Sequence, residues 1–138
     1  MKYFRHLVIV LLGFSFLGAA EPNYKADIDA FKLKVLQDQG AVVVDIRTAP
    51  EWQETGIIQG SVPITFFQAN GSYDIDAFMN AFMRAVPDKT HPVVIICRTG
   101  SRSVPVADFL ARTGYQNVYN QKHGIVEWIG RGLPTVKP

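Results

Sequence analysis

Two runs of apolar, mostly β-branched residues stand out along the chain, at residues 41–46 and 92–96. Short runs of this kind are typical of strands that are buried on both faces of a sheet. Shorter runs of similar character predict further strands at residues 62–64 and 117–119. Asp45 and Arg47 lie at the end of the first long run and Cys97 follows the second, so both ends are candidates for positioning a site.

Helical periodicity is clearest over residues 74–86. Apolar side chains recur there at helical spacing, which predicts an amphipathic helix whose apolar face packs in the core, formed by Ile75, Phe78, Met79, Phe82, Met83 and Val86. Further helices are predicted over residues 24–39, 102–112 and 125–129. Pro105 is tolerated only in a first turn, so the helix over 102–112 must begin close to residues 102–104. The segment that holds Trp52 is expected to be a loop.

Strands that alternate with helices predict parallel strand pairing and an α/β sandwich. In such sheets, ligands bind at the carboxyl ends of the strands. The two strands that end in chemically active residues, at Asp45 and at Cys97, therefore point to the place where a site is expected.

The first twenty residues have a different pattern. Lys2 and Arg5 precede an almost uninterrupted apolar run at residues 7–17, and small residues follow at 18–20. This order is typical of a secretory signal peptide, so we expect residues 1–20 to be removed and residues 21–138 to form one domain. The run is shorter than the about 20 residues of a membrane span, although an uncleaved N-terminal anchor is the alternative. The expected location is outside the cytoplasm, in the periplasm.

Charge excludes two classes of partner. The chain has 14 Lys and Arg against 12 Asp and Glu, and loss of Lys2 and Arg5 with the signal would leave these charges balanced. The sequence contains no run of Lys or Arg. Nothing in this distribution indicates binding to nucleic acid or to an anionic membrane surface.

Cys97 is the only cysteine, so no internal disulfide can form. A lone thiol in an oxidising compartment is exposed to oxidation, and its presence there calls for burial or for a function. The residues after it form a tight loop that leads into a helix. Loop amides and the first amides of a helix lack partners within the helix, and they can point at one spot with the helix dipole behind them. Together with Arg98 and Arg102, such a cradle would stabilise a thiolate or a negatively charged sulfur donor.

Several motifs resemble those of the rhodanese family, in the same order along the chain. Residues 42–47 resemble its first signature, an apolar strand that ends in Asp-x-Arg. Residues 50–52 and 56–62 resemble the next stretch, and residues 97–103 resemble the active-site loop Cys-x-x-Gly-x-Arg-Ser. The C-terminal half is similar to the family at residues 114–118, 124–128 and 132–134. Each motif alone is weak, but the ordered set covers nearly all of the chain after residue 20.

The resemblance implies a three-layer α/β/α sandwich with a mostly parallel sheet of about five strands. It implies a sulfurtransferase in which Cys97 carries sulfur as a persulfide, donated by an anion such as thiosulfate and passed to a thiol, cyanide or a protein cysteine. Arg102 would act in catalysis by positioning the loop and offering charge to the substrate. Asp45 and Arg47 would brace the site. Substrate would be bound by the remaining loop residues, Arg98, Thr99, Gly100, Ser101 and Ser103. No metal or organic cofactor is implied.

Two departures from the family pattern are visible. Gly56 is followed by Ile57 where the family often has histidine, and His123 stands before Gly124 where the family often has a glycine pair. The second departure places a titratable side chain in a loop near the expected site, with no role assigned to it.

Two other functions remain open. Related phosphatases use a loop one residue longer, Cys-x5-Arg, which fits a tetrahedral oxyanion. Here the arginine falls at Cys-x4-Arg, which favours sulfur transfer over phosphatase or arsenate reductase activity. The other alternative is a non-catalytic module of the same fold that binds a partner or senses redox state through Cys97. A buried structural thiol is a further alternative for Cys97, which the loop and the arginines that follow it disfavour.

Overall fold

The computed structural model describes residue 18 and residues 20–138, and the expected signal segment lies almost entirely outside this part. Its strands form one sheet in the order β1-β5-β4-β2-β3, in which every neighbouring pair is parallel. The strands are β1 (Ala26–Ile28), β2 (Val42–Asp45), β3 (Val62–Pro63), β4 (Val93–Ile96) and β5 (Val118–Gln121). The helices are α1 (Ala30–Asp38), α2 (Ala49–Thr55), α3 (Ile75–Ala85), α4 (Ser103–Arg112) and α5 (Gly124–Gly130). The predicted parallel sheet of about five strands is confirmed.

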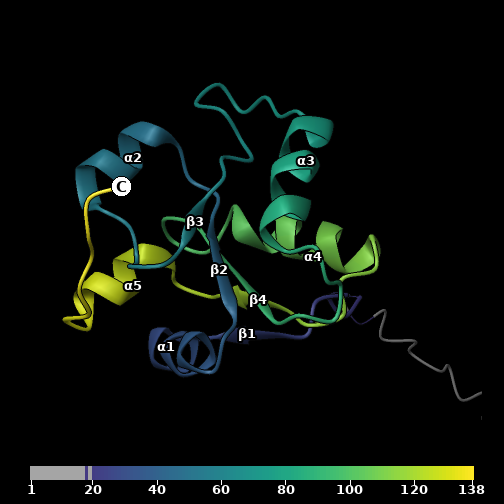
Figure 1. The fold of residues 1–138 in the computed structure, drawn as a ribbon, viewed down its shortest axis with the longest axis horizontal. Helices are drawn as coiled ribbons and strands as arrows, with labels where there is room; N and C mark the ends of the chain where they lie inside the picture. The colour runs from purple at the N-terminus through teal and green to yellow at the C-terminus, as the bar shows by residue number, and fades with distance from the viewer. Residues whose placement is uncertain (1–17, 19) are drawn as a thin grey trace, which may run out of the picture.

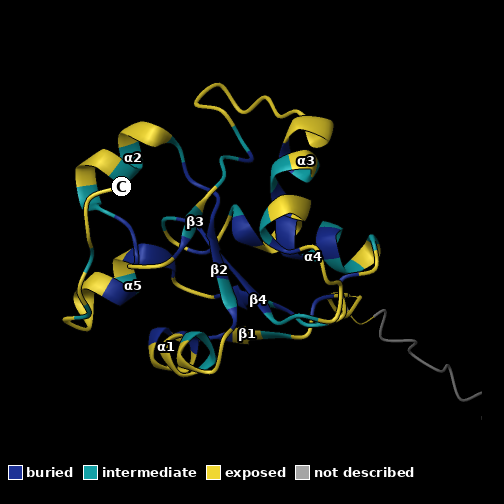
Figure 2. Ribbon diagram, in the orientation of Figure 1, coloured by how far each residue is buried: buried dark blue, intermediate teal, exposed yellow. Residues whose placement is uncertain are grey.

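Helices cover both faces of this sheet (Figure 1). One core cluster joins α3 and α4 to one face through residues such as Val44, Phe82 and Leu110. The other joins α1 and α5 to the opposite face through residues such as Leu33 and Ile96. The burial colours follow the same layers, since the strands are mostly buried and the helices expose their outer sides (Figure 2). The arrangement is the predicted three-layer sandwich.

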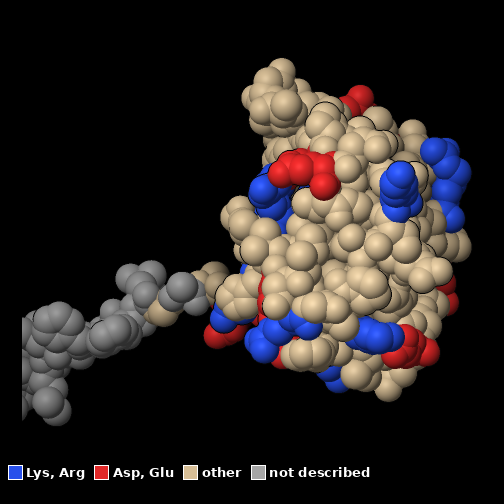
Figure 3. Space-filling view, turned by 90° about the vertical axis from the view of Figure 1, so that its left-hand side faces the viewer, with Lys and Arg blue, Asp and Glu red and all other residues tan. Residues whose placement is uncertain are grey.

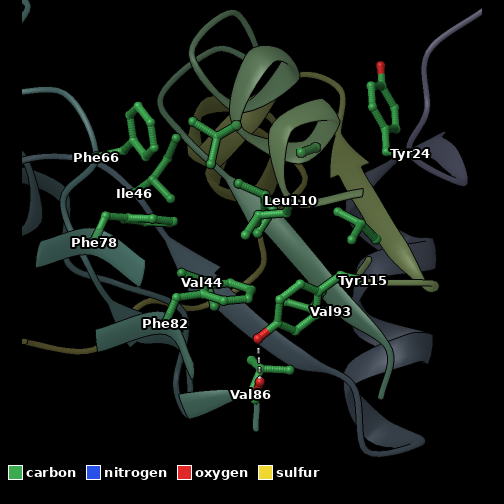
Figure 4. Packing of buried hydrophobic residues seen from close by; sticks show 14 of the residues in the cluster. Tyr24, Val44, Ile46, Phe66, Phe78, Phe82, Val86, Val93, Leu110 and Tyr115 are labelled. Carbon is green, nitrogen blue, oxygen red and sulfur yellow. Dashed lines mark hydrogen bonds between the residues drawn. The ribbon is translucent and has the colours of Figure 1, made fainter. Parts of the chain in front are cut away.

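The larger cluster is packed around aromatic rings from α3 (Figure 4). Phe82 stacks on Phe78 with 5.6 Å between ring centroids. It also packs against Tyr115 in a T-shaped arrangement, with 5.0 Å between ring centroids. The hydroxyl of Tyr115 donates to the carbonyl of Val86 at 2.9 Å, so its polar end is satisfied where α3 ends. Burial also raises the pKa of Tyr115. This packing fixes α3 and α4 on the face of the sheet whose core cluster includes Cys97.

The helix predicted over residues 24–39 is wrong in its first part. Residues 26–28 form β1, which pairs in parallel with β5, and the helix begins only at Ala30. Asp29 is its N-cap and its side chain accepts a hydrogen bond from the amide of Lys32. Within the helix, Phe31 and Val35 are 49% and 45% exposed. A short edge strand was hidden because its few residues blend into the following helical pattern.

The segment that holds Trp52 is not the expected loop but the short helix α2. None of its residues is buried, so it has no apolar periodicity for sequence reasoning to detect. Its start has the capping-box pattern, in which the carboxylate of Glu51 accepts from the backbone amide of Thr48 at 3.1 Å. Pro50 lies in the first turn, where proline is tolerated.

The amphipathic helix over residues 74–86 is confirmed as α3, with part of its predicted face outside the core. Phe78 and Phe82 are buried and Met79 packs against the core, whereas Ile75 and Met83 are 41% and 45% exposed. The predicted start of the helix after the Cys97 loop is also confirmed, since α4 begins at Ser103 and Pro105 lies in its first turn. In the described part of the chain, no helix combines the length and apolarity needed to cross a membrane.

Candidate functional site

The site lies where β2 and β4 end side by side. The two strands are paired from Val42 with Val93 to Asp45 with Ile96, so the residues after them meet at one edge of the sheet. The chain leaves β2 toward β3 on one side and leaves β4 toward β5 on the other. This edge is therefore the topological switch point of the sheet, which is where α/β proteins bind ligands. Cys97 follows β4 here, as predicted.

The thiol of Cys97 is fully buried at the base of the loop. The amide of Gly100 donates to its sulfur at 3.2 Å, and the hydroxyl of Ser103 lies 3.3 Å from the same atom. The Ser103 hydroxyl also donates to the carbonyl of Gly100 at 3.2 Å. The loop thus closes around the sulfur with a backbone donor on one side and a hydroxyl at the start of α4 on the other.

The loop is tight because it rests on the start of α5. The amides of Ile125 and Val126 donate to the carbonyls of Cys97 at 2.9 Å and Arg98 at 3.2 Å. Gly100 has a φ of 98°, and a Cβ at this position would collide with the carbonyl of Lys122. Gly124 has a φ of 66°, and a Cβ there would collide with the backbone of Arg98. Both positions therefore require glycine for close backbone approach as well as for conformation.

Arg102 does not point freely at the site but is held by Glu51 of α2. Its two terminal nitrogens donate to the two carboxylate oxygens of Glu51, at 2.9 and 2.6 Å. This bidentate pair lowers the pKa of Glu51 to about 2, chiefly through the Arg102 hydrogen bonds, and raises the pKa of Arg102. The predicted positioning role of Arg102 thus has a partner that tethers the loop to α2.

Asp45 and Arg47 form a fully buried ion pair with 2.8 Å between Nη2 and Oδ2. Asp45 also accepts from the indole nitrogen of Trp52 at 3.1 Å. Arg47 donates to the hydroxyl of Thr55 at 2.8 Å and to the carbonyl of Gly56 at 3.0 Å. Because Trp52 and Thr55 belong to α2, the pair fixes that helix, and with it Glu51, against the end of β2.

The remaining loop residues lie toward solvent. Arg98 reaches Glu54 of α2 at 3.5 Å in a partly exposed ion pair, while Thr99 and Ser101 are exposed. His123, the departure from the family pattern, is also exposed, and among the described residues the Cys97 sulfur has Gly100 and Ser103 rather than His123 as its hydrogen-bond partners. The structure therefore brings Cys97, Gly100 and Ser103 together around the sulfur and places the two arginines on the rim.

A cleft of about 700 Å³ opens beside the loop. Ser101, Arg102 and Pro105 form one wall, and Thr48 and Glu51 at the start of α2 form a second. The β3–α3 connection completes the cleft with residues 67–69 and 71. In Figure 1 this connection rises above the sheet between α2 and α3. Substrate that reaches the loop of Cys97 through this cleft would pass the Arg102–Glu51 pair.

Sequence reasoning assigned no role to Glu51, although this residue stands in one of the motifs it quoted. The signal that could have found its helix is the spacing from Thr48 to Glu51, which matches a capping box. No sequence pattern pairs Glu51 with Arg102, since 51 residues separate them. Among the described residues, no group of three or more His, Cys, Asp or Glu side chains is placed to hold a metal ion.

Comparison with known proteins agrees with this geometry. The family model described as "Rhodanese-like domain" matches residues 29–131. A sulfurtransferase of Allochromatium vinosum is 30% identical over 112 residues, covering 81% of this chain and 94% of that protein. The thiosulfate sulfurtransferase GlpE of Actinobacillus succinogenes is 34% identical over 100 residues, covering 72% of this chain and 79% of that protein.

Solved structures share the fold. A crystal structure from M. tuberculosis superimposes with a TM-score of 0.71 at 24% identity, covering 83% of this chain and 99% of that chain. A rhodanese-related protein from Thermoplasma volcanium gives a TM-score of 0.61 at 23% identity, covering 83% and 100%. The extent of the family match and the identity to sulfurtransferases together assign the sequence: the chain belongs to the rhodanese-like family.

Proposed function

We propose that this protein is a thiosulfate sulfurtransferase that carries sulfur as a persulfide on Cys97. The observation that carries the proposal is the hydrogen bond from the Gly100 amide to the Cys97 sulfur at 3.2 Å, within a loop that holds no second cysteine. A backbone donor aimed at sulfur favours a negatively charged thiolate or persulfide over a neutral thiol. Relatives named as sulfurtransferases support the same reaction class.

The first step is attack of the Cys97 thiolate on the outer sulfur of thiosulfate. A bond forms between this sulfur and Cys97 Sγ, and the bond between the two sulfur atoms of thiosulfate breaks. The electron pair leaves with sulfite. No external oxidant or reductant is needed, and one covalent intermediate divides the transfer into two steps.

The second step returns the thiolate. A nucleophile such as cyanide or a thiolate attacks the terminal sulfur of the persulfide, and the S–S bond to Cys97 breaks with its electrons going to Cys97. In this mechanism Arg102 keeps the loop in position through Glu51, while Gly100 and Ser103 contact the sulfur. Ser101 lines the cleft beside the loop, Arg98 and Thr99 lie toward solvent where they can meet an incoming substrate, and Asp45 and Arg47 support α2.

The short loop supports sulfur transfer over oxyanion ester hydrolysis. The arginine stands at Cys-x4-Arg, and the position one residue further is Ser103, whose hydroxyl turns inward to the sulfur. A loop closed in this way around a single sulfur atom is a poor match for a tetrahedral phosphate. We also propose, from the sequence of residues 1–20 alone, that the protein acts outside the cytoplasm.

The intact mass of the protein before and after incubation with thiosulfate tests the proposal. The wild type should gain one sulfur atom and lose it again when cyanide is added, whereas Cys97→Ser should gain none. If the wild-type protein is folded, has a free thiol and still gains no sulfur, transfer from thiosulfate is refuted. Such a result would favour the alternative of a binding or redox-sensing module.

A further inference from the structure

A second, smaller hollow of about 250 Å³ adjoins the cleft beside the Cys97 loop. It shares Phe67 and Pro105 with that cleft, so the two spaces lie next to each other. Apart from the shared residues, its walls are aromatic or aliphatic, formed by Phe66, Tyr73, Ile75 and Phe109. Cleft and hollow together are called the acceptor groove below.

We propose that the acceptor groove binds the sulfur acceptor as a cysteine-bearing segment of a partner protein, with an apolar side chain near that cysteine seated in the aromatic hollow. This inference rests on the sulfur transfer proposed above and names its acceptor class. It selects one member from the broader set of thiols, cyanide and protein cysteines.

Charge balance at the rim suits an uncharged chain as the occupant of the acceptor groove. Both arginines of the loop are matched by acids of α2, Arg102 by Glu51 at 2.6 Å and Arg98 by Glu54 at 3.5 Å. An uncharged chain that covers the rim therefore buries no charge that lacks a partner. Figure 3, which views the side carrying α2 and α5, shows a mostly uncharged surface whose main red patch, in the upper part, adjoins blue atoms.

Size favours a chain over a compact nucleophile. A volume of about 700 Å³ lies in the range of about 300–1,000 Å³ that proteins use for drug-sized ligands. Cyanide or a few-atom thiol would leave most of it filled with water. A peptide can place a thiol at Ser101 and Arg102 and still reach past Phe67 into the hollow.

The hollow is built to receive an apolar group. Phe66 is buried and packs edge-on against Phe78 and Phe109, with 4.8 and 6.3 Å between ring centroids. Tyr73 stacks on this fixed ring at 5.5 Å yet remains 57% exposed, and Ile75 is 41% exposed. Preformed apolar surface that remains partly exposed gains most from covering by an apolar side chain.

The transfer step balances with no additional reagent. The thiolate of the partner cysteine attacks the terminal sulfur of the Cys97 persulfide, forming a new S–S bond. The bond between that sulfur and Cys97 Sγ breaks, and its electron pair restores the Cys97 thiolate. The products are the partner's persulfide and the free enzyme.

Capped, uncharged hexapeptides test the proposal in two ways. One peptide carries phenylalanine two positions from its cysteine, and its counterpart carries glycine there. In single-turnover transfer from sulfur-loaded enzyme, the phenylalanine peptide should react about tenfold faster at subsaturating concentration. Serine analogues of both peptides, which cannot accept sulfur, are titrated into the free protein by NMR, and the phenylalanine analogue should shift amides of residues 66–75.

Three variants locate the effect. Tyr73→Ser and Ile75→Ser should each reduce the preference for phenylalanine over glycine to about threefold or less. The rate of transfer to the phenylalanine peptide, divided by the rate of transfer to cyanide, should fall as well. Phe31→Ser is the matched control, because Phe31 is 49% exposed on α1 and lies in neither space. It should keep the full preference.

The outcomes separate the two proposals. Enzyme that gains no sulfur but binds the phenylalanine analogue at residues 66–75 would refute the sulfur transfer and support the groove. Enzyme that loads and transfers sulfur with equal rates to both peptides would overturn the groove and leave sulfur transfer standing. A free aromatic thiol that reacts as fast as the phenylalanine peptide would also overturn it, by assigning the groove to small thiols.

Discussion

Arg102 of the Cys97 loop and Glu51 of α2 form a bidentate ion pair, with N–O distances of 2.9 and 2.6 Å. The pair joins the loop after β4 to the helix after β2, so it ties together the two strand ends that build the site. Neither side chain is more than 27% exposed. Paired charges in such partly buried positions interact more strongly than surface ion pairs.

A double-mutant cycle should measure this coupling. Glu51→Gln and Arg102→Gln should each lower the free energy of unfolding by about 1–3 kcal/mol, because each leaves a partner without its charge-assisted hydrogen bonds. The double variant should lose less unfolding free energy than the two single variants lose together, and the difference, the coupling energy, should be about 1–2 kcal/mol. Urea unfolding gives all four values. The matched cycle on Arg98 and Glu54, a more exposed pair, should give under about 1 kcal/mol. Additive losses at Arg102 and Glu51 would contradict a direct interaction.

Protonation of Glu51 at acid pH should lower the free energy of unfolding. Its pKa falls from 4.5 to about 2 in the folded protein, so the folded state binds this proton less tightly than the unfolded state. The stabilisation is complete above about pH 4.5 and is lost as the pH falls toward about 2. The loss is at most about 3 kcal/mol, at about 1.4 kcal/mol for each pKa unit. Unfolding free energies measured between pH 5 and 2 should fall less steeply for Glu51→Gln than for the wild type, and equal slopes would contradict this assignment.

Asp45→Asn should be among the most destabilising conservative changes in the chain. It removes the charge that Arg47 faces in a fully buried pair and weakens the acceptor for Trp52. Removing one partner of a buried ion pair costs about 3–5 kcal/mol. Asp38→Asn breaks an exposed pair with Lys34 and should cost under about 0.5 kcal/mol. Thermal unfolding of the two variants compares them, and a small loss for Asp45→Asn would show that α2 is held by other contacts.

Gly100→Ala should impair sulfur transfer more than its backbone strain alone explains. Gly40 and Gly100 have similar φ values, 102° and 98°, but a Cβ at Gly40 meets nothing within 4 Å whereas one at Gly100 collides with the Lys122 carbonyl. Gly40→Ala should cost about 1 kcal/mol of stability and keep activity. Gly100→Ala should displace the amide that contacts Cys97, and we expect a loss of at least about tenfold in the rate of persulfide formation. Equal activity of the two variants would contradict the proposed role of this amide.

Ser103→Ala isolates the hydroxyl beside the sulfur. The hydroxyl contacts Cys97 Sγ at 3.3 Å and donates to the Gly100 carbonyl at 3.2 Å. Its loss should cost about 1 kcal/mol of stability and slow sulfur loading several-fold. Ser61→Ala, which also removes a buried hydroxyl but lies outside the loop, should cost similar stability with normal loading. Normal loading in Ser103→Ala would assign this hydroxyl to structure alone.

The sequence by itself determined the strands at residues 42–45 and 93–96, the amphipathic helix α3 and the loop that follows Cys97. These elements were predictable because their signals are local. A buried parallel strand needs a continuous apolar run, an amphipathic helix needs a helical repeat, and proline at position 105 limits where α4 can begin. The same local residues identified Cys97 and its loop as the candidate site.

Only the tertiary structure decided how that site is supported. Residues 26–28 become a strand because β5, some 90 residues later, offers an edge to pair with. Residues 49–55 become a helix without a buried face because Asp45 and Arg47 hold Trp52 and Thr55. Glu51 meets Arg102 only because β2 and β4 are neighbours in the sheet. Such contacts join residues far apart in the chain, and no local pattern of hydrophobic and polar positions encodes them.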